Sequence, residues 1–214
     1  MRSKHGLEQC VQDWVRGWSL CRGAPSPVAE PDGYRIDVGA PGHRIRFVLT
    51  GPASTGHRAA TLTAPGTWLK VCGDRAEVVS ALSAAWRVEA PEYLMSAALS
   101  SDDAGSIEPG YSAGITSDGD VHDVVVLAED GTVAASGRVA VAGQAAVVDQ
   151  VATHAEHRRR GLGRYVMRAL GVAAAESGAT RSMLVATAEG LALYRTLGWA
   201  VESEITAAHL PEQG

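Results

Sequence analysis

Residues 157–170 read HRRRGLGRYVMRAL. Three arginines lead into Gly161 and Gly163, and apolar residues then recur at helical spacing. The first turn of a helix has unpaired backbone N–H groups and a partial positive charge, so it can bind an anion. Glycines let a ligand approach the backbone, and arginines at a helix N-terminus are unfavourable unless an anion is present. The pattern therefore predicts a phosphate-binding turn, with a solvated run of arginines as the alternative.

Other phosphate-binding and nucleic-acid-binding patterns fit this turn less well. Neither the dinucleotide pattern G-x-G-x-x-G nor the Walker pattern G-x-x-x-x-G-K-[ST] is present. The formal net charge of the chain is −5, and no aromatic ladder flanks the short basic run. We therefore expect a small phosphate-bearing ligand and no nucleic acid as partner.

The composition is that of an ordinary folded protein. The chain has 214 residues, 46% hydrophobic and 20% charged, enough for one large domain or two small ones. Three cysteines without metal-type spacing indicate free thiols in a reducing compartment. The first residues lack the apolar core of a signal peptide, and no apolar run is long enough for a membrane span. We expect a cytoplasmic protein with no membrane partner.

A polar, turn-rich segment at residues 100–110 separates two patterns of elements. Before it, strands and helices alternate, and residues 6–23 place Leu7, Val11, Trp14 and Trp18 at helical spacing. Residues 74–85 predict a second helix, with Asp74 as its N-cap. A core-facing stripe is the favoured interpretation of the two tryptophans, over a binding platform. After it, we expect three strands across 121–153 with turns at 129–132 and 141–144, a helix at 162–177, a strand at 181–187, a short helix at 188–198 and a closing strand at 199–206.

Two segments of the second region resemble the GNAT acetyltransferase superfamily. Residues 147–170, VVDQVATHAEHRRRGLGRYVMRAL, resemble its acetyl-CoA-binding motif, whose core [Q/R]-x-x-G-x-[G/A] falls on residues 158–163. Residues 182–201, SMLVATAEGLALYRTLGWAV, resemble its second block, a strand followed by a short helix that carries a tyrosine. The resemblance covers residues 111–206. It implies an α+β fold (an α/β sandwich) with a mixed, mostly antiparallel sheet whose central strands splay apart.

The resemblance also implies a domain division and a cosubstrate. Residues 111–214 form the catalytic domain, 100–110 a linker, and 1–99 a smaller α/β half, similar to the reduced GNAT-like half of some family members, that shapes the acceptor site. Acetyl-CoA is the expected cosubstrate, and no metal is expected. The residues that the resemblance assigns to its binding are Val151, Ala152 and Thr153 through their backbone, Arg158, Arg159, Arg160, Gly161, Leu162, Gly163 and Arg164 around the pyrophosphate, and Thr187 and Gly190.

Catalytic roles follow from the same resemblance and from the chemistry of acyl transfer. Tyr194 matches the family tyrosine, whose hydroxyl acts as general acid at the CoA sulfur. An N–H near Val151 is expected to polarise the thioester carbonyl. Asp149 is the candidate base, and strand alternation predicts Asp149, Val151 and Thr153 on one face. A hydrogen-bonding role for Asp149 at a strand edge is weighed equally. His122, Asp123 and His154 are weaker candidates.

The chain departs from the family pattern at three points. Thr187 stands where an asparagine is frequent, seven residues before the tyrosine, and Gly190 stands where alanine is common. The two helices that usually follow the first strand, and that shape the acceptor pocket, have no room between residues 110–117 and 124–131. We expect the N-terminal half to supply that wall, through the helix around residues 7–18 or the strand at 43–47.

These observations predict a GNAT-type N-acetyltransferase that moves an acetyl group from acetyl-CoA to a primary amine by direct attack. The acceptor is a small molecule or a peptide amine, and the residues do not choose between them. The resemblance implies a possible homodimer, because many members of the family dimerise, although no residue pattern of this chain demands one. The alternative function is that of a non-catalytic acyl-CoA-binding sensor or interaction domain.

Overall fold

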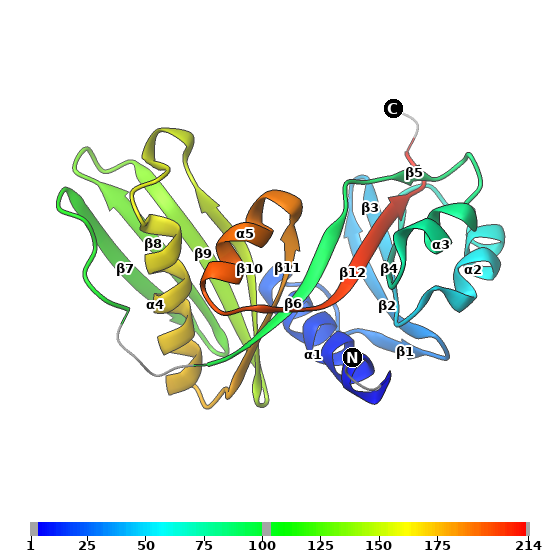
Figure 1. Ribbon diagram of the computed structural model, residues 1–214, viewed down its shortest axis with the longest axis horizontal. Coiled ribbons are helices and arrows are strands. Elements are labelled where there is room, and N and C mark those ends of the chain that lie inside the picture. Colours follow the sequence, from blue (N-terminus) through cyan, green and yellow to red (C-terminus); the bar gives the residue numbers. More distant parts are fainter. Residues whose placement is uncertain (1–3, 100–103, 213–214) are drawn as a thin grey trace.

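The computed structural model describes residues 4–99 and 104–212 (Figure 1). Its helices are α1 (Lys4–Arg22), α2 (Thr55–Thr61), α3 (Arg75–Ser80), α4 (Leu162–Glu176) and α5 (Ala188–Thr196), with short 3-10 turns η1 (Pro52–Ser54) and η2 (Ala155–His157). The first six strands are β1 (Val28–Glu30), β2 (Gly33–Ala40), β3 (His43–Leu49), β4 (Thr67–Cys72), β5 (Arg87–Val88) and β6 (Glu92–Ala98). The other six are β7 (Tyr111–Asp118), β8 (Val121–Ala128), β9 (Val133–Ala142), β10 (Ala145–Thr153), β11 (Arg181–Thr187) and β12 (Ala200–His209).

The strands form one mixed sheet. Its order is β1-β2-β3-β4-β12-β6-β11-β10-β9-β8-β7, and β5 pairs with β12 beside this path. Among the described strands, only the pairs β3–β4 and β10–β11 are parallel. The predicted three-strand segment is present as β8, β9 and β10, and the predicted helix at 162–177 is α4. The expected α+β class with a mostly antiparallel sheet is therefore confirmed.

Strands from the two halves of the chain alternate in the middle of the sheet. β6 lies between β11 and β12, and the last strand, β12, lies between β6 and β4 (Figure 1). Residues 100–103 of the predicted linker lie outside the described residues. The division into 1–99, 100–110 and 111–214 stays a prediction, but one continuous hydrogen-bonded ladder joins the regions before and after the linker.

Two apolar layers cover opposite faces of the central strands. On β10, Val148 packs in the cluster beneath α4, whereas its neighbour Val147 packs in the cluster beneath α1. Successive side chains of a strand point to opposite faces, so α4 and α1 sandwich the same strand. Trp14 and Trp18 are buried in the α1 layer, which confirms the core-facing interpretation of the tryptophan stripe.

Specific polar contacts fix α1 to the second half of the chain. The buried carboxylate of Asp13 pairs with Arg181 of β11. Arg138 of β9 donates to the Cys21 carbonyl oxygen at 3.0 Å, while its other nitrogens pair with Asp123 of β8 at 2.7 and 2.8 Å. Helix α1 is therefore anchored along its length to β9, β10 and β11, strands that the chain reaches more than 110 residues later.

The structure bears on three further predictions, which concern the helix that begins after Asp74, the cysteines and membrane-spanning helices. The helix predicted from Asp74 onward begins as expected, with the Asp74 side chain accepting from the Glu77 N–H at 2.9 Å. It ends at Ser80, five residues earlier than predicted, because the chain turns to pack Leu82 and Trp86 into an apolar cluster. Cys10, Cys21 and Cys72 are buried thiols that form no disulfide. Among the described residues, no helix is both long and apolar enough to cross a membrane.

We predict that Gly17 is required for α1 to dock. A Cβ atom at this position would lie 2.3 Å from Cγ2 and 2.5 Å from Cβ of Val147, and no rotamer change moves that Cβ. Gly17→Ala should therefore lower the free energy of unfolding by about 1–3 kcal/mol through overpacking. This loss should appear although alanine favours a helix over glycine by about 1 kcal/mol.

The matched control is Gly171→Ala in α4, where a Cβ would meet only Leu99 at 3.7 Å. It should be neutral or stabilising, by at most about 1 kcal/mol. Urea unfolding of both variants and the parent measures the difference. Equal stabilisation by the two substitutions would contradict the close approach of α1 to β10.

Candidate functional site

The centre of the site is the point where β10 and β11 separate. The parallel pairing joins only Ala145–Val147 to Arg181–Met183, and the strands diverge beyond it. Here β10 carries a β-bulge against β9: its register jumps from Asp149–Arg138 to Ala152–Ser136, one extra residue on β10. Gln150 adopts the left-handed backbone conformation, with φ of 56°. A bulge bends its strand and increases local twist, which turns β10 away from its parallel neighbour.

The bulge overturns one prediction made from strand alternation. Asp149 points toward α1, where it pairs with Arg22, but Val151 packs in the cluster beneath α4. Thr153 also faces α4, since its hydroxyl would lie 3.4 Å from a Cβ on Gly163. The extra residue reverses the alternation, so Asp149 lies on the opposite face from Val151 and Thr153. The expectation of one shared face was wrong because period-two reasoning assumes an unbroken strand.

A cavity of about 700 Å³, the strand cleft, fills the space between the separating strands. It brings together residues that the sequence analysis assigned from two distant motifs. Those among its lining are Asp149, Val151, Ala152, Thr153, Arg158, Gly163, Thr187, Gly190 and Tyr194. Residues that the sequence analysis did not name also line it: Arg22, Glu92, Val148, Gln150, Leu184, Val185, Ala186, Glu189 and Leu193.

The arginine–glycine turn closes one end of the strand cleft. Gly161 is the N-cap of α4 with φ of 75°, and no side chain caps this helix end. Arg158 lines the cleft, and its Nε donates to the Thr153 carbonyl oxygen at 3.4 Å. The α4 N-terminus therefore retains the unpaired N–H groups that suit an anion.

Part of the predicted turn faces elsewhere. Arg160, Gly161, Leu162 and Arg164 line a neighbouring cavity of about 160 Å³, and the Leu162 side chain is buried in the core beneath α4. Arg159 lines neither cavity and adopts the left-handed conformation, with φ of 64°. Of the predicted turn, Arg158 and Gly163 thus line the strand cleft, and these five residues do not.

Helix α5 carries Tyr194 to the wall of the strand cleft. Thr187 is the N-cap of this helix, and its hydroxyl accepts from the Gly190 N–H at 3.2 Å. The threonine that replaces the frequent asparagine therefore orders the helix that holds the tyrosine. Burial, and secondarily the charge of Asp149, raises the pKa of Tyr194 above its ordinary 10.0. The phenol is consequently a proton donor at neutral pH.

A second cavity of about 270 Å³, the N-terminal cavity, adjoins the strand cleft. The two share Arg22, Glu92, Asp149 and Val185. The other lining residues of the N-terminal cavity come from α1, β3 and β4 and are Trp14, Trp18, His43, Arg46, Trp68 and Lys70. Helix α1 and the strand at 43–47, both named from the sequence as candidate acceptor walls, thus supply five of the ten lining residues of this cavity.

Charged groups meet where the two cavities join. Arg22 donates to both carboxylate oxygens of Asp149, at 2.5 and 3.2 Å. The buried ammonium of Lys70 pairs with Glu92. Glu92 escaped the sequence analysis because neither glutamate of WRVEAPEYLM belongs to a recognisable motif. Its position on β6, beside β11, is visible only in the sheet order.

The weaker base candidates lie away from both cavities. His122 is buried and hydrogen-bonds Ser117 and Ser177 at 2.8 and 2.9 Å, and Asp123 pairs with Arg138. His154 is exposed in the turn before η2. With Glu156 and His157 it forms a group whose potential ligand atoms lie within 4.8 Å of one another. His157 already contacts the Tyr111 hydroxyl at 3.0 Å, so its Nδ1 is engaged in a hydrogen bond within the protein.

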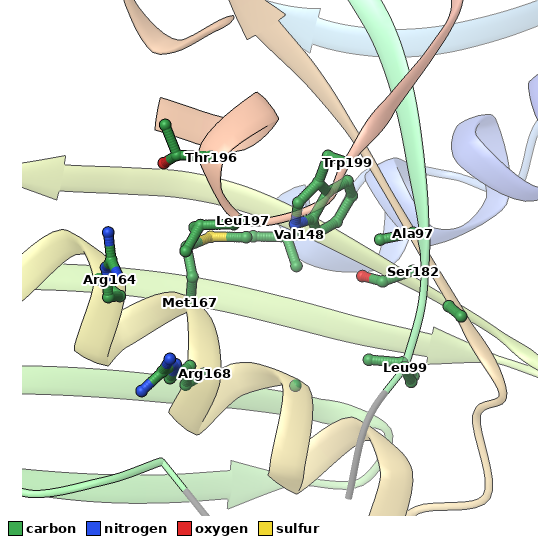
Figure 2. A pocket seen from close by; sticks show the side chains of 12 residues that line it. Ala97, Leu99, Val148, Arg164, Met167, Arg168, Ser182, Thr196, Leu197 and Trp199 are labelled. Atoms are coloured by element: carbon green, nitrogen blue, oxygen red, sulfur yellow. The ribbon is translucent and has the colours of Figure 1, made fainter. Parts of the chain in front are cut away.

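Another cavity, of about 410 Å³, lies on the α4 face of the sheet. Figure 2 shows Met167 of α4 extending toward Leu197, with Arg164 and Arg168 on the same helix; Leu197 and Trp199 connect α5 to β12. Of its lining residues only Val148 also lines the strand cleft. It contains neither Asp149 nor Tyr194, so it is separate from the candidate chemistry.

Comparison with known proteins agrees with this geometry. Residues 120–201 match the family model of the acetyltransferase (GNAT) domain. No curated relative matches the chain by sequence. A GCN5-related N-acetyltransferase from Kribbella flavida shares the fold, with a TM-score of 0.66 and 17% identity over 97% of this chain and 96% of that one.

Two further solved structures share the fold. One is a GCN5-related N-acetyltransferase from Sphaerobacter thermophilus, with a TM-score of 0.61 and 11% identity over 85% of this chain and 78% of that one. The other, from Novosphingobium aromaticivorans and assigned to the GNAT family, has a TM-score of 0.60 and 21% identity over 98% and 100%. Residues 120–201 therefore match the acetyltransferase (GNAT) domain by sequence, and the chain shares the overall fold of these GNAT structures.

Proposed function

We propose that the protein is an N-acetyltransferase that uses acetyl-CoA and acetylates a primary amine. One observation carries the proposal: the cleft between the separating strands β10 and β11 runs from the uncapped N-terminus of α4 to Tyr194 and Asp149. A long ligand with a phosphate group at one end and a reactive group at the other suits such a cleft.

The residues of the strand cleft fit the pantetheine and pyrophosphate of CoA. Gln150 and Val151 have no Cα partner on β9, and beyond Val147 the other edge of β10 has no partner on β11. Backbone groups along this edge can therefore pair with an extended amide-bearing chain. A Cβ on Gly163 would reach to 3.4 Å from the Thr153 hydroxyl and 3.7 Å from Leu193, so glycine keeps this end of the cleft open.

Acetyl-CoA supplies an activated acetyl thioester. The amine nitrogen forms a bond to the carbonyl carbon as the C–S bond breaks, giving an amide and CoA. Tyr194 donates its hydroxyl proton to the departing sulfur, for which a raised pKa keeps it protonated. Asp149, at the junction of the two cavities, takes the proton that the attacking amine loses. In this proposal the Val151 N–H, in the bulged segment of β10, donates to the thioester carbonyl.

The N-terminal cavity is the proposed acceptor site. It opens onto the strand cleft at Asp149 and Glu92, so an amine held there faces the proposed position of the thioester. Its volume of about 270 Å³ is just below the roughly 300–1,000 Å³ of most small-molecule pockets. A small-molecule amine therefore fits this cavity better than a folded protein substrate.

Acetyl-CoA binding tests the proposal directly. Calorimetric titration should show micromolar affinity for acetyl-CoA, with ATP binding at least about tenfold more weakly. Gly163→Val should weaken acetyl-CoA binding about tenfold or more by filling the cleft, whereas Gly171→Val on the same helix should leave it unchanged. Equal affinity for the two nucleotides would remove the CoA assignment. Binding without thiol release toward a broad panel of amines would instead favour a non-catalytic acyl-CoA-binding protein.

Tyr194→Phe tests the proposed general acid. Turnover measured by free-thiol release should fall by about a hundredfold or more, while the dissociation constant of acetyl-CoA stays within about twofold. The raised pKa adds a second readout, because the protonated phenol is the active form. Any alkaline loss of turnover due to Tyr194 should have its midpoint above the ordinary tyrosine pKa of 10.0 and be missing in the phenylalanine variant. Unchanged turnover in the variant would exclude the acid role.

Asp149→Asn tests the proposed base. Removing the carboxylate should lower kcat about a hundredfold and leave acetyl-CoA affinity unchanged, because Asp149 contacts Arg22 and not the α4 turn. Glu92→Gln is the comparison, since Glu92 lines the same junction but is held by Lys70. A larger kcat loss in Glu92→Gln than in Asp149→Asn would transfer the base role to Glu92.

A further inference from the structure

Arg46 is a buried cation without a carboxylate partner. It lies on β3, is 7% exposed and lines the N-terminal cavity. Its guanidinium carbon lies 3.8 Å from the centroid of the Trp18 ring, and its Nε donates to Nε2 of His43 at 3.2 Å. Across the part of the chain that the structure describes, no carboxylate oxygen lies within 4.0 Å of its nitrogens.

The neighbouring cations are paired, which makes Arg46 an exception. Lys70 has Glu92, Arg22 has Asp149, and Arg58, elsewhere on the N-terminal half, has Asp32. A buried charge is costly unless an opposite charge or several hydrogen bonds accompany it. Arg46 has a π contact and one neutral hydrogen bond instead, so its Nη groups remain free to bind a ligand in the cavity.

His43 cannot supply the missing negative charge. Burial, together with the charges of Arg46 and Lys70, lowers the pKa of His43 to about 3, so the imidazole is neutral at physiological pH. It accepts the Arg46 Nε–H as a neutral group. Burial lowers the pKa of Arg46 only to about 10, so the guanidinium keeps its charge.

The charges of the N-terminal cavity are arranged with a polarity. Both carboxylates, Glu92 and Asp149, lie at the end shared with the strand cleft. Arg46 lines the N-terminal cavity but not the strand cleft. Trp14, Trp18 and Trp68 add aromatic surface to the same cavity. A ligand with an ammonium or amine at one end, an anion at the other and an apolar body matches this order.

We propose that the acceptor is a small amine that also carries a carboxylate, as an amino acid does, and that Arg46 binds this carboxylate through its Nη groups. The inference rests on the proposed acetyltransferase function and specifies its substrate class. A guanidinium presents two parallel N–H donors that match a carboxylate, and its stacking on Trp18 holds that fork in one plane. Arg46 therefore selects the acceptor, while Asp149 and Tyr194 act on the reacting atoms.

The test compares pairs of acceptors that differ only in having a carboxylate or a carboxamide. The panel contains the proteinogenic amino acids and the ω-amino acids up to 6-aminohexanoate, each beside its carboxamide, with acetyl-CoA and free-thiol detection. For the best acceptors, kcat/KM should be about a hundredfold or more higher for the acid than for its amide. Acids that react no better than their amides across the panel would overturn the proposal.

Arg46→Gln should remove this discrimination and bring the ratio of acid to amide close to one. Arg44→Gln is the matched control on the same strand: Arg44 pairs with Glu212 and does not line the cavity, so the ratio should stay at the parent value. Circular dichroism and acetyl-CoA affinity establish that each variant is folded. A folded Arg46→Gln enzyme that keeps the preference for acids would show that Arg46 is structural.

A measurement of ligand binding at equilibrium tests the role of Arg46 without relying on turnover. N-acetyl-L-amino acids and their amides, titrated against the fluorescence of the cavity tryptophans, should bind in the parent with the same acid preference and lose it in Arg46→Gln. Failure to bind acetyl-CoA would defeat the proposed function itself. Acetylation of amines without regard to a carboxylate would leave that function intact and defeat only this inference.

Discussion

The parallel pairing of β10 with β11 ends after three residues, and the site depends on that ending. The bulge at Gln150 turns β10 away, leaves backbone groups of Val151 to Thr153 facing the strand cleft, and reverses the side-chain alternation. Asp149 therefore points toward α1, while Val151 packs beneath α4. Gly137, opposite the bulge, makes this possible: a Cβ there would lie 2.7 Å from Val166 and 3.2 Å from Val151. One extra residue thus separates the group proposed to take a proton from the edge proposed to hold the cosubstrate.

The other parallel pair shows what happens without such an opening. Helix α2 likewise follows β3 and precedes β4 in the chain, but the pairing of these two strands continues over five residues, from Ile45–Thr67 to Leu49–Val71. The strands stay joined, and Arg46 and Lys70 on them turn their charges into the N-terminal cavity instead. The sheet therefore contains two strand–helix–strand units of similar topology. One separates into the strand cleft, and the other stays closed and forms a wall.

Helix α1 connects these two units. Its docking over β9, β10 and β11 covers the face opposite α4, and ion pairs with Arg181 and Asp149 hold it at both strands of the cleft. Trp18 and Arg22 reach the N-terminal cavity from this helix. Residues near the N-terminus thus line the cavity that we propose as the acceptor site. The interleaving of β6 and β12 joins the two halves, because each half supplies a strand to the ladder of the other.

The residues alone determined the family resemblance, the strands β8 to β10, helices α4 and α5, and the meeting of Tyr194 with the Arg158–Gly163 turn, because these depend on local periodicity and short motifs. Tertiary structure decided the rest. A bulge leaves no signature in VVDQVAT, so the faces of Asp149 and Val151 could not be read from it. Arg46, Lys70 and Glu92 come from three separate strands whose adjacency exists only in the sheet order. Their charges interact through space rather than along the chain, and that is the physical reason why the proposed acceptor side of the site could be found only from the fold.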